Sequence, residues 1–283
     1  MKSLKKCFGL AGGRKSWLSF ARPLCGLVML ALPLTTSYGQ EKIDVQKVLE
    51  KENYKASDLM VAIPGQNFLC LATEVTQELY ESVMGYNPSE FKGEKNLPVE
   101  NVSWIDAVKF CNKLSEKEGL KPCYSYKEST NADEWDLYND EMREWSETRW
   151  ENFNKNFVCN EKANGYRLPT VEEWQYAAKG GQEFKYSGSD NIDEVAWYDD
   201  NSGDKTHPVA QKAPNGYGLY DMSGSVWEWC WDSSPGSSEY RCLCGGSWYY
   251  SAFICEVGDR SWNIAYRTYN DLGFRIVRSS SKK

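Results

Sequence analysis

The sequence predicts a single α+β domain with little regular secondary structure. Two stretches carry clear helix start signals, and after residue 185 the chain consists of short strand-like runs between Gly, Asn and Pro turns. The 283 residues include 12 Trp and 18 Tyr. Because each large ring buries much area on few residues, aromatic side chains can hold such an irregular fold together. The length allows one large domain or two small ones, with a substantial core in either case.

Residues 1–39 have the pattern of an export signal. A basic start precedes an apolar run at residues 24–34, and Ser37 and Gly39 put small side chains at the −3 and −1 positions of a cleavage site. The apolar run is too short to cross a membrane as a helix. We therefore expect export to the cell surface or periplasm. An uncleaved anchor and lipid attachment at Cys25 are open alternatives, and membrane contact is expected only through such an anchor.

Charge and composition exclude several classes of function. The formal net charge is −7, and no basic stripe with interleaved aromatics follows the leader, which argues against a nucleic-acid partner. His207 is the single histidine, so a His-rich metal centre is excluded. Eight cysteines follow the leader, an even number that permits disulfides in an exported protein, and buried free thiols are an equally acceptable reading. These cysteines are Cys70, Cys111, Cys123, Cys159, Cys230, Cys242, Cys244 and Cys255.

The globular domain is predicted to span residues 59–280. Residues 40–58 are strongly charged and indicate a linker or a short helix, and an apolar run begins at Leu59. Residues 127–156 are acidic, contain three tryptophans and show only weak periodicity. We interpret them as an insertion that its tryptophans pack onto the surface.

Two helices are predicted inside this domain. Ser103 begins the first as an N-cap, apolar residues follow at helical spacing, and Gly119 ends it. Thr170 and Glu173 form a capping box at the start of the second helix, which stops at Gly180. Short strands and turns are expected to account for the rest of the domain after residue 185.

Six short motifs lie in order along roughly residues 60–278. They are TEVT (73–76), PVENVSW (98–104), NGYRLPTVEEW (164–174), YGLYDMSGSVWEW (217–229), GGSW (245–248) and LGFR (272–275). Together they resemble the formylglycine-generating, or sulfatase-modifying factor, family. The resemblance implies a C-type-lectin-like α+β fold that is low in regular structure, with the GSVWEW stretch in the core.

The resemblance also bears on catalysis. Catalytic members of the family carry two cysteines five residues apart after the Gly-Gly-Ser, and these soft thiolates bind copper. Here Cys255 occupies the second position and Tyr250 the first, and a phenol does not replace a thiolate at such a site. Relatives that use a His-ligated iron need more histidines, and Ser225 replaces the usual Asn of GNxWEW, which weakens a calcium site there. We therefore predict no catalysis, metal or cofactor; the alternative is an oxidoreductase that acts on a cysteine-containing peptide.

The segment at residues 245–275 has the composition of a recognition surface. It mixes tyrosines with Ser, Asn and Asp, and no period of 2 or 3.6 runs through it. Stiff aromatics give contact area while small polar groups adapt to a ligand. An irregular core segment is the alternative. With its GGSW start and GFR end, the segment resembles the variable proteins of diversity-generating retroelements, of the treponemal type. In that class the C-terminal segment is rewritten at adenine-containing codons, and such rewriting cannot produce Lys, Glu, Gln, Met or Trp.

This resemblance makes fourteen positions at about residues 249–271 the candidate ligand-binding surface, and none of them carries an excluded residue. They are Tyr249, Tyr250, Ser251, Phe253, Ile254, Asp259, Ser261, Asn263, Ile264, Tyr266, Thr268, Tyr269, Asn270 and Asp271. The intervening residues, Trp262 and Cys255 among them, are then fixed framework. The expected partner is an extracellular protein or glycan. An ordinary non-catalytic family member with a Tyr-lined groove is the alternative.

Overall fold

The computed structural model describes residues 43–135 and 147–280, which belong to one folded unit. The predicted export signal at residues 1–39 and residues 136–146 lie outside the described residues. The helices are α1 (Val45–Leu49), α2 (Gln77–Met84), α3 (Trp104–Lys117), α4 (Glu147–Asn156), α5 (Val171–Lys179), α6 (Ile192–Val195) and α7 (Asp199–Ser202). Short 3₁₀ helices lie at Ala56–Leu59 (η1), Ala132–Glu134 (η2) and Ala252–Cys255 (η4).

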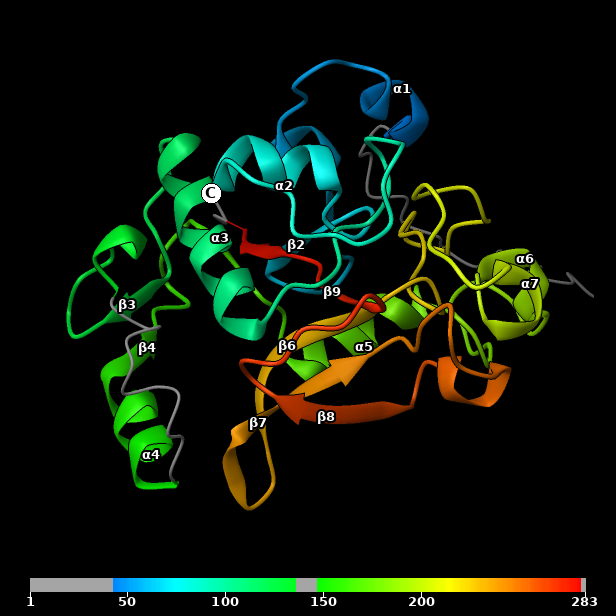
Figure 1. Ribbon diagram of the computed structural model, residues 1–283. Helices are drawn as coiled ribbons and strands as arrows, with labels where there is room; N and C mark the ends of the chain where they lie inside the picture. Colours follow the sequence, from blue (N-terminus) through cyan, green and yellow to red (C-terminus); the bar gives the residue numbers. More distant parts are fainter. Residues whose placement is uncertain (1–42, 136–146, 281–283) are drawn as a thin grey trace, which may run out of the picture. The chain divides into compact units, whose positions relative to one another are not determined.

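The strands are short and form three sheets (Figure 1). They are β1 (Met60–Ala62), β2 (Phe68–Leu71), β3 (Tyr124–Tyr126), β4 (Phe157–Cys159), β5 (Tyr166–Arg167), β6 (Trp227–Ser234), β7 (Ser237–Cys244), β8 (Arg260–Ile264), β9 (Leu272–Gly273) and β10 (Val277–Ser279). The sheet orders are β1-β2-β10-β5, β3-β4 and β8-β7-β6-β9. All pairings are antiparallel except β6 with β9. Antiparallel sheets beside separate helices are the α+β class that the sequence predicts.

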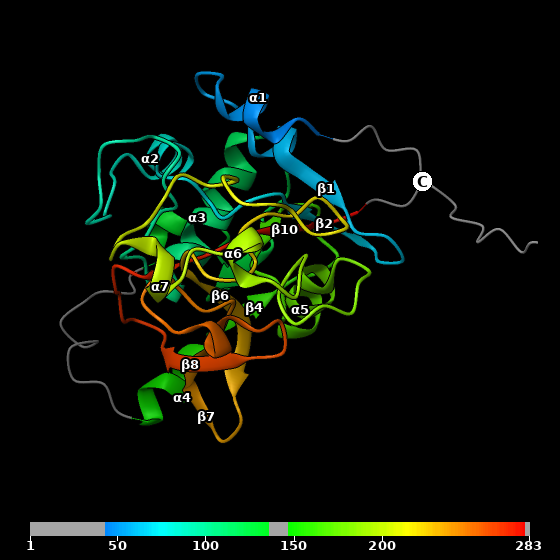
Figure 2. The same ribbon diagram turned by 90° about the vertical axis from the view of Figure 1, so that its right-hand side faces the viewer.

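The first sheet joins the two ends of the domain. Val277 on β10 lies opposite Cys70 on β2, so a strand near the start of the domain pairs with the last one. The turned view shows β1, β2 and β10 together, away from β7 and β8 (Figure 2). The C-terminal segment therefore leaves the β8-β7-β6-β9 sheet at β9 and is fixed again at β10.

Both predicted helices are confirmed with their caps. Ser103 accepts from the backbone N–H of Asp106, whose carboxylate accepts from the Ser103 N–H in return. Thr170 and Glu173 form the same reciprocal pair at the start of α5. Gly180 ends α5 with a positive φ of 60°, a conformation that costs glycine little.

Aromatic side chains dominate the main core. Trp104 and Trp229 are fully buried, and their indole N–H groups donate to the backbone oxygens of Cys230 and Val102, each at 3.0 Å. Phe110 on α3 lies 5.2 Å from Phe274, ring centroid to ring centroid. Buried indoles need such partners, because an unpaired polar group inside the protein is costly. The GSVWEW stretch is thus core, as the sequence predicts.

Two of the segments that the sequence separates from the rest of the domain contact the main core. Within residues 43–58 the structure has the short helix α1, whose Val45 and Leu49 are buried in the main core and extend it before residue 59. In the expected insertion at residues 127–156, Trp135 is also buried in that core, 5.2 Å from the ring of Phe157. Charged residues between the apolar ones hide both contacts in the sequence. Trp145 lies outside the described residues.

Across residues 43–135 and 147–280, no helix combines the length and the apolar character that crossing a membrane requires.

Candidate ligand-binding surface

Three motifs that are far apart in sequence meet at one buried carboxylate beneath the C-terminal segment. Glu228 on β6 accepts a hydrogen bond from Trp174 Nε1 at 2.6 Å and bonds from the guanidinium of Arg275 at 2.8–3.1 Å. Arg275 also donates to the backbone oxygens of Leu71 and Tyr220. Both charged side chains are buried. Because removing one partner would strand a charge inside the protein, this network fixes the position at which the segment ends.

The segment begins in a conformation that favours glycine. Gly245 and Gly246 have φ values of 98° and 75°, and a Cβ on Gly246 would lie only 2.7 Å from Cys255 Sγ. The next residue, Ser247, donates its hydroxyl to Asp271 Oδ2 at 2.8 Å. The first residues of the segment are thereby tied to its last ones.

Trp248 forms a fixed wall beside the segment. Its side chain is buried and meets Phe91 edge-to-face at 5.4 Å between ring centroids. Its backbone N–H donates to Ser225 O at 2.8 Å, and its indole N–H donates to Asn270 O at 3.2 Å. These contacts make Trp248 a support for the surface and leave its neighbours free to face solvent.

None of the fourteen candidate side chains is buried in this frame. Tyr249, Phe253 and Tyr269 are 64%, 61% and 46% exposed, and the others are exposed or half-buried. The buried side chains between residues 249 and 271 all belong to expected framework positions. They are Cys255, Val257 and Ala265. The framework therefore supplies the anchoring contacts of the segment.

On strand β8 the alternation of side chains between the two faces separates candidate from framework positions, although here framework residues Arg260 and Trp262 are the exposed ones and Ser261 and Asn263 are half-buried. Ser261 lies opposite Leu243 on β7, whereas Trp262 lies opposite Cys242. Candidate positions Ser261 and Asn263 thus share the face of Leu243. Trp262 projects to the other face, where Cys242 packs in the same buried cluster as α5 residues.

Ile264, Asp271 and Trp262 each show that the division between candidate and framework positions is not strict. Ile264 is a candidate, yet the alternation puts it on the face of Trp262. Asp271 has a structural contact with Ser247, and burial raises the pKa of its carboxyl. Trp262 was expected to be framework but is 39% exposed. No signal in the sequence indicates this exposure, because codon rewriting cannot produce Trp and composition therefore assigns it to the frame.

Two adjacent tyrosines of the candidate set form a contacting pair. The rings of Tyr249 and Tyr250 meet edge-to-face at 5.6 Å, and Tyr250 also lies 5.7 Å from Trp227. The backbone oxygen of Tyr250 accepts from the N–H of Asp199 on α7 at 3.1 Å. The backbone beneath the exposed rings is therefore held in place.

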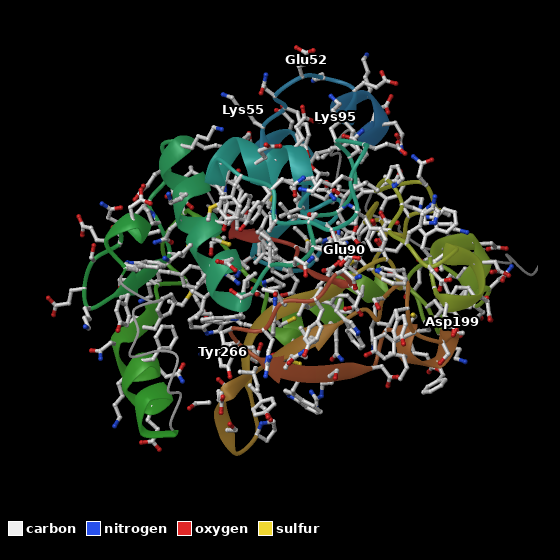
Figure 3. The ribbon with its side chains drawn as sticks, in the orientation of Figure 1. Glu52, Lys55, Glu90, Lys95, Asp199 and Tyr266 are labelled. Atoms are coloured by element: carbon white, nitrogen blue, oxygen red, sulfur yellow. The ribbon has the colours of Figure 1, made fainter. Side chains whose placement is uncertain are left out.

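Tyr266 lies apart from that pair. Figure 3 shows Tyr266 and Asp199 toward opposite ends of β8, and a five-residue strand spans about 13 Å between its first and last Cα. The guanidinium carbon of Arg267 lies 5.6 Å from the centroid of the Tyr266 ring. Tyr266 and the Tyr249–Tyr250 pair thus lie toward opposite ends of β8 and do not line one pocket.

The structure does not assemble a two-thiol site at Tyr250 and Cys255. Burial raises the pKa of the Cys255 thiol to about 12, so the reactive thiolate is disfavoured. The Sγ atoms of Cys230 and Cys244 lie 3.8 Å apart in the β8-β7-β6-β9 sheet, and none of the eight cysteines forms a disulfide in the structure. In the part of the chain that the structure describes, no group of three or more His, Cys, Asp or Glu side chains is arranged to hold a metal ion.

Comparison with known proteins agrees with the six motifs, three of which meet at Glu228. The sulfatase-modifying factor enzyme 1-like domain matches residues 37–280. The chain belongs to this family. A protein of Paenibacillus barcinonensis described as chaperone protein LppX is 45% identical over 230 residues, which are 73% of this chain and 78% of that protein. The formylglycine-generating enzyme of Streptomyces coelicolor is 33% identical over 149 residues, only 41% of this chain and 48% of the enzyme.

Solved structures of family-like domains agree with the fold. Treponema denticola variable protein 1 superposes with a TM-score of 0.66 at 36% identity, covering 78% of this chain and 91% of that one. CarF superposes with a TM-score of 0.60 at 30% identity, covering 75% and 86%. The predicted family, its α+β fold and the resemblance to a variable protein are confirmed.

Proposed function

We propose that this member of the sulfatase-modifying factor family is an exported, non-catalytic binding protein whose contact surface is the set of candidate positions between residues 249 and 271. The observation that carries the proposal is the concentration of exposed aromatic side chains in that segment. Within the described ranges, ten large apolar side chains are strongly exposed, and half of them belong to this segment. They are Tyr249, Tyr250, Phe253, Trp262 and Tyr269. Exposed aromatics on a rigid frame are the usual anchors of protein interfaces.

The comparisons support this function in two ways. The similarity to a treponemal variable protein supports a segment whose side chains vary while its frame stays fixed. The 45% identical relative is described as a chaperone, which supports a polypeptide over a glycan as the ligand. Export rests on the pattern of residues 1–39.

The competing function is a formylglycine-generating type of oxidation. Tyr250 stands at the first thiol position of the catalytic relatives, and the pKa of the remaining Cys255 thiol is raised by burial. A lone protonated thiol provides neither a soft-metal ligand pair nor dithiol chemistry. These features favour binding over catalysis.

A binding screen tests the proposal. The purified chain is screened against linear peptides and a glycan array beside an aromatic-free variant, in which Tyr249, Tyr250, Phe253, Tyr266 and Tyr269 are all replaced by Ser. We expect ligands whose affinity falls at least about 30-fold in that variant, the equivalent of about 2 kcal/mol for one anchor.

A matched control removes exposed aromatics elsewhere, with Tyr86→Ser and Phe184→Ser. These changes should leave affinity unaltered. Two results would contradict the proposed binding surface. One is a ligand that binds the wild-type chain and the aromatic-free variant equally, and the other is a screen that yields no ligand at all.

A further inference from the structure

Strand β8 is an edge strand, and its register with β7 decides which of its residues point their N–H and C=O groups away from the sheet. The sheet order β8-β7-β6-β9 leaves one side of β8 without a neighbouring strand, and β8 runs along the lower rim of the sheet in Figure 1. The N–H of Ala265 donates to Glu239 O at 3.0 Å, which fixes the phase of the ladder. In an antiparallel pair, inward and outward residues alternate. Ser261 and Asn263 therefore bond to β7, and Arg260, Trp262 and Ile264 point their N–H and C=O groups outward.

The far end of this edge is closed by the chain itself. Asn263 Oδ1 accepts the outward N–H of Ile264 at 2.9 Å, and the N–H of Arg267 donates to Ile264 O at 2.9 Å. Among residues 43–135 and 147–280, no group bonds to the outward N–H or C=O of Arg260 or Trp262. The outward N–H and C=O groups of Arg260 and Trp262 therefore remain available to pair with another strand, whereas those of Ile264 are already bonded.

Two exposed cations lie at the ends of this edge. Arg260 begins β8 and Arg267 follows it, and both are exposed. Neither guanidinium forms an ion pair within the described ranges; each lies beside its aromatic neighbour, Trp262 or Tyr266. Arg260 also lines a groove on the α5 side of the sheet, whose other charged residues are Lys179, Glu172 and Asp232. An incoming carboxylate therefore finds Arg260 and Arg267 along the β8 edge, whereas in the groove Arg260 and Lys179 lie beside two carboxylates that already balance their charge.

We propose that the ligand of this surface is an extended, acidic peptide segment that adds a strand to β8 through the outward backbone groups of Arg260 and Trp262. This proposal rests on the proposed binding function and names its ligand class. The backbone bonds do not depend on side-chain identity, so they would persist whatever residues occupy Ser261 and Asn263. Strand addition of this kind takes affinity from the main chain and specificity from alternate side chains.

Proline substitution separates the backbone of Trp262 from its side chain. Trp262→Pro removes the outward N–H and the indole but no bond to β7, since edge strands tolerate proline where the N–H faces solvent. Trp262→Ala removes the indole alone and is the matched control. Linear peptides selected against the wild-type chain should be rich in Asp and Glu. They should bind Trp262→Pro about tenfold more weakly than Trp262→Ala, because the peptide carbonyl loses its donor.

Hydrogen exchange of the wild-type chain gives a readout that needs no variant. Saturation with a selected peptide should slow exchange at the Trp262 amide, whereas the Ser261 amide is already protected by β7. Equal affinities of Trp262→Pro and Trp262→Ala, or an unchanged Trp262 amide, would overturn strand addition. The binding function would still stand if the same peptides lost affinity for the aromatic-free variant.

The remaining outcomes also decide the matter. Binding of glycans but of no linear peptide would overturn the peptide assignment and leave the binding function intact. Light scattering could instead show a monomer–dimer equilibrium that Trp262→Pro abolishes. That result would assign the β8 edge to a second copy of this chain and would equally overturn the peptide assignment.

Discussion

Phe274→Ala and Tyr249→Ala test whether the C-terminal segment is divided into a rigid frame and a tolerant surface. Phe274 is fully buried, with its ring centroid 5.2 Å from that of Phe110 and 6.3 Å from that of Tyr80. Removing such a ring from a packed core costs about 3–5 kcal/mol. Tyr249 is 64% exposed, and a surface change of that kind alters stability by about 0.5 kcal/mol or less.

Thermal unfolding converts these costs into melting temperatures. For a domain of this size each kcal/mol shifts Tm by about 2–4 °C. Phe274→Ala should therefore lower Tm by about 6–20 °C, and Tyr249→Ala by no more than about 2 °C. Urea denaturation monitored by tryptophan fluorescence gives an independent free energy for both variants. A large loss of stability in Tyr249→Ala, or none in Phe274→Ala, would refute the division into frame and surface.

Other residues give equally direct outcomes. Arg275→Met leaves the buried Glu228 carboxylate without its counter-ion and should cost about 3–5 kcal/mol in urea denaturation, part of which Glu228→Gln should restore in the double variant. Burial raises the pKa of Asp221 to about 6 and that of Glu100 to about 7. The folded chain therefore holds more protons than the unfolded one, so the free energy of unfolding should fall as pH rises from about 4 to about 7; Glu100→Gln should flatten that slope, and a slope of opposite sign would contradict it. With or without copper, the chain should not convert the cysteine of a sulfatase-type peptide to formylglycine under oxygen, and turnover that Cys255→Ser abolishes would reverse this conclusion. Sequencing the neighbouring DNA should reveal a reverse transcriptase and a near-copy of the gene's end that differs at adenines; a neighbourhood without either would argue against rewriting of the segment.

The sequence predicts the capped helices well, because their signals are local. Ser103 with Asp106, and Thr170 with Glu173, specify helix starts within four residues. The burial of Val45 in α1 escapes prediction, since its neighbours are charged and its contacts are distant. Long-range packing, not local pattern, decides that part of the fold.

The limits of the candidate surface are also predictable from local sequence signals. The motifs around residues 245–275 identify its limits, but the alternation of Ser261, Trp262 and Asn263 occupies only one five-residue strand between a 3₁₀ helix and a turn. An alternation over only five residues cannot be recognised in the sequence. Trp262 is exposed because the sheet ends at β8, and that edge is a property of the topology.

The most direct test of the binding surface exchanges all fourteen candidate residues at once for other residues that adenine rewriting allows, and leaves the frame unaltered. The affinity of a ligand selected against the wild-type chain is then measured by calorimetry, beside the Tm of both proteins. We expect the exchanged chain to fold with a Tm within a few degrees of the wild type and to lose the ligand. A folded variant that still binds the ligand with wild-type affinity would contradict the assignment of the surface.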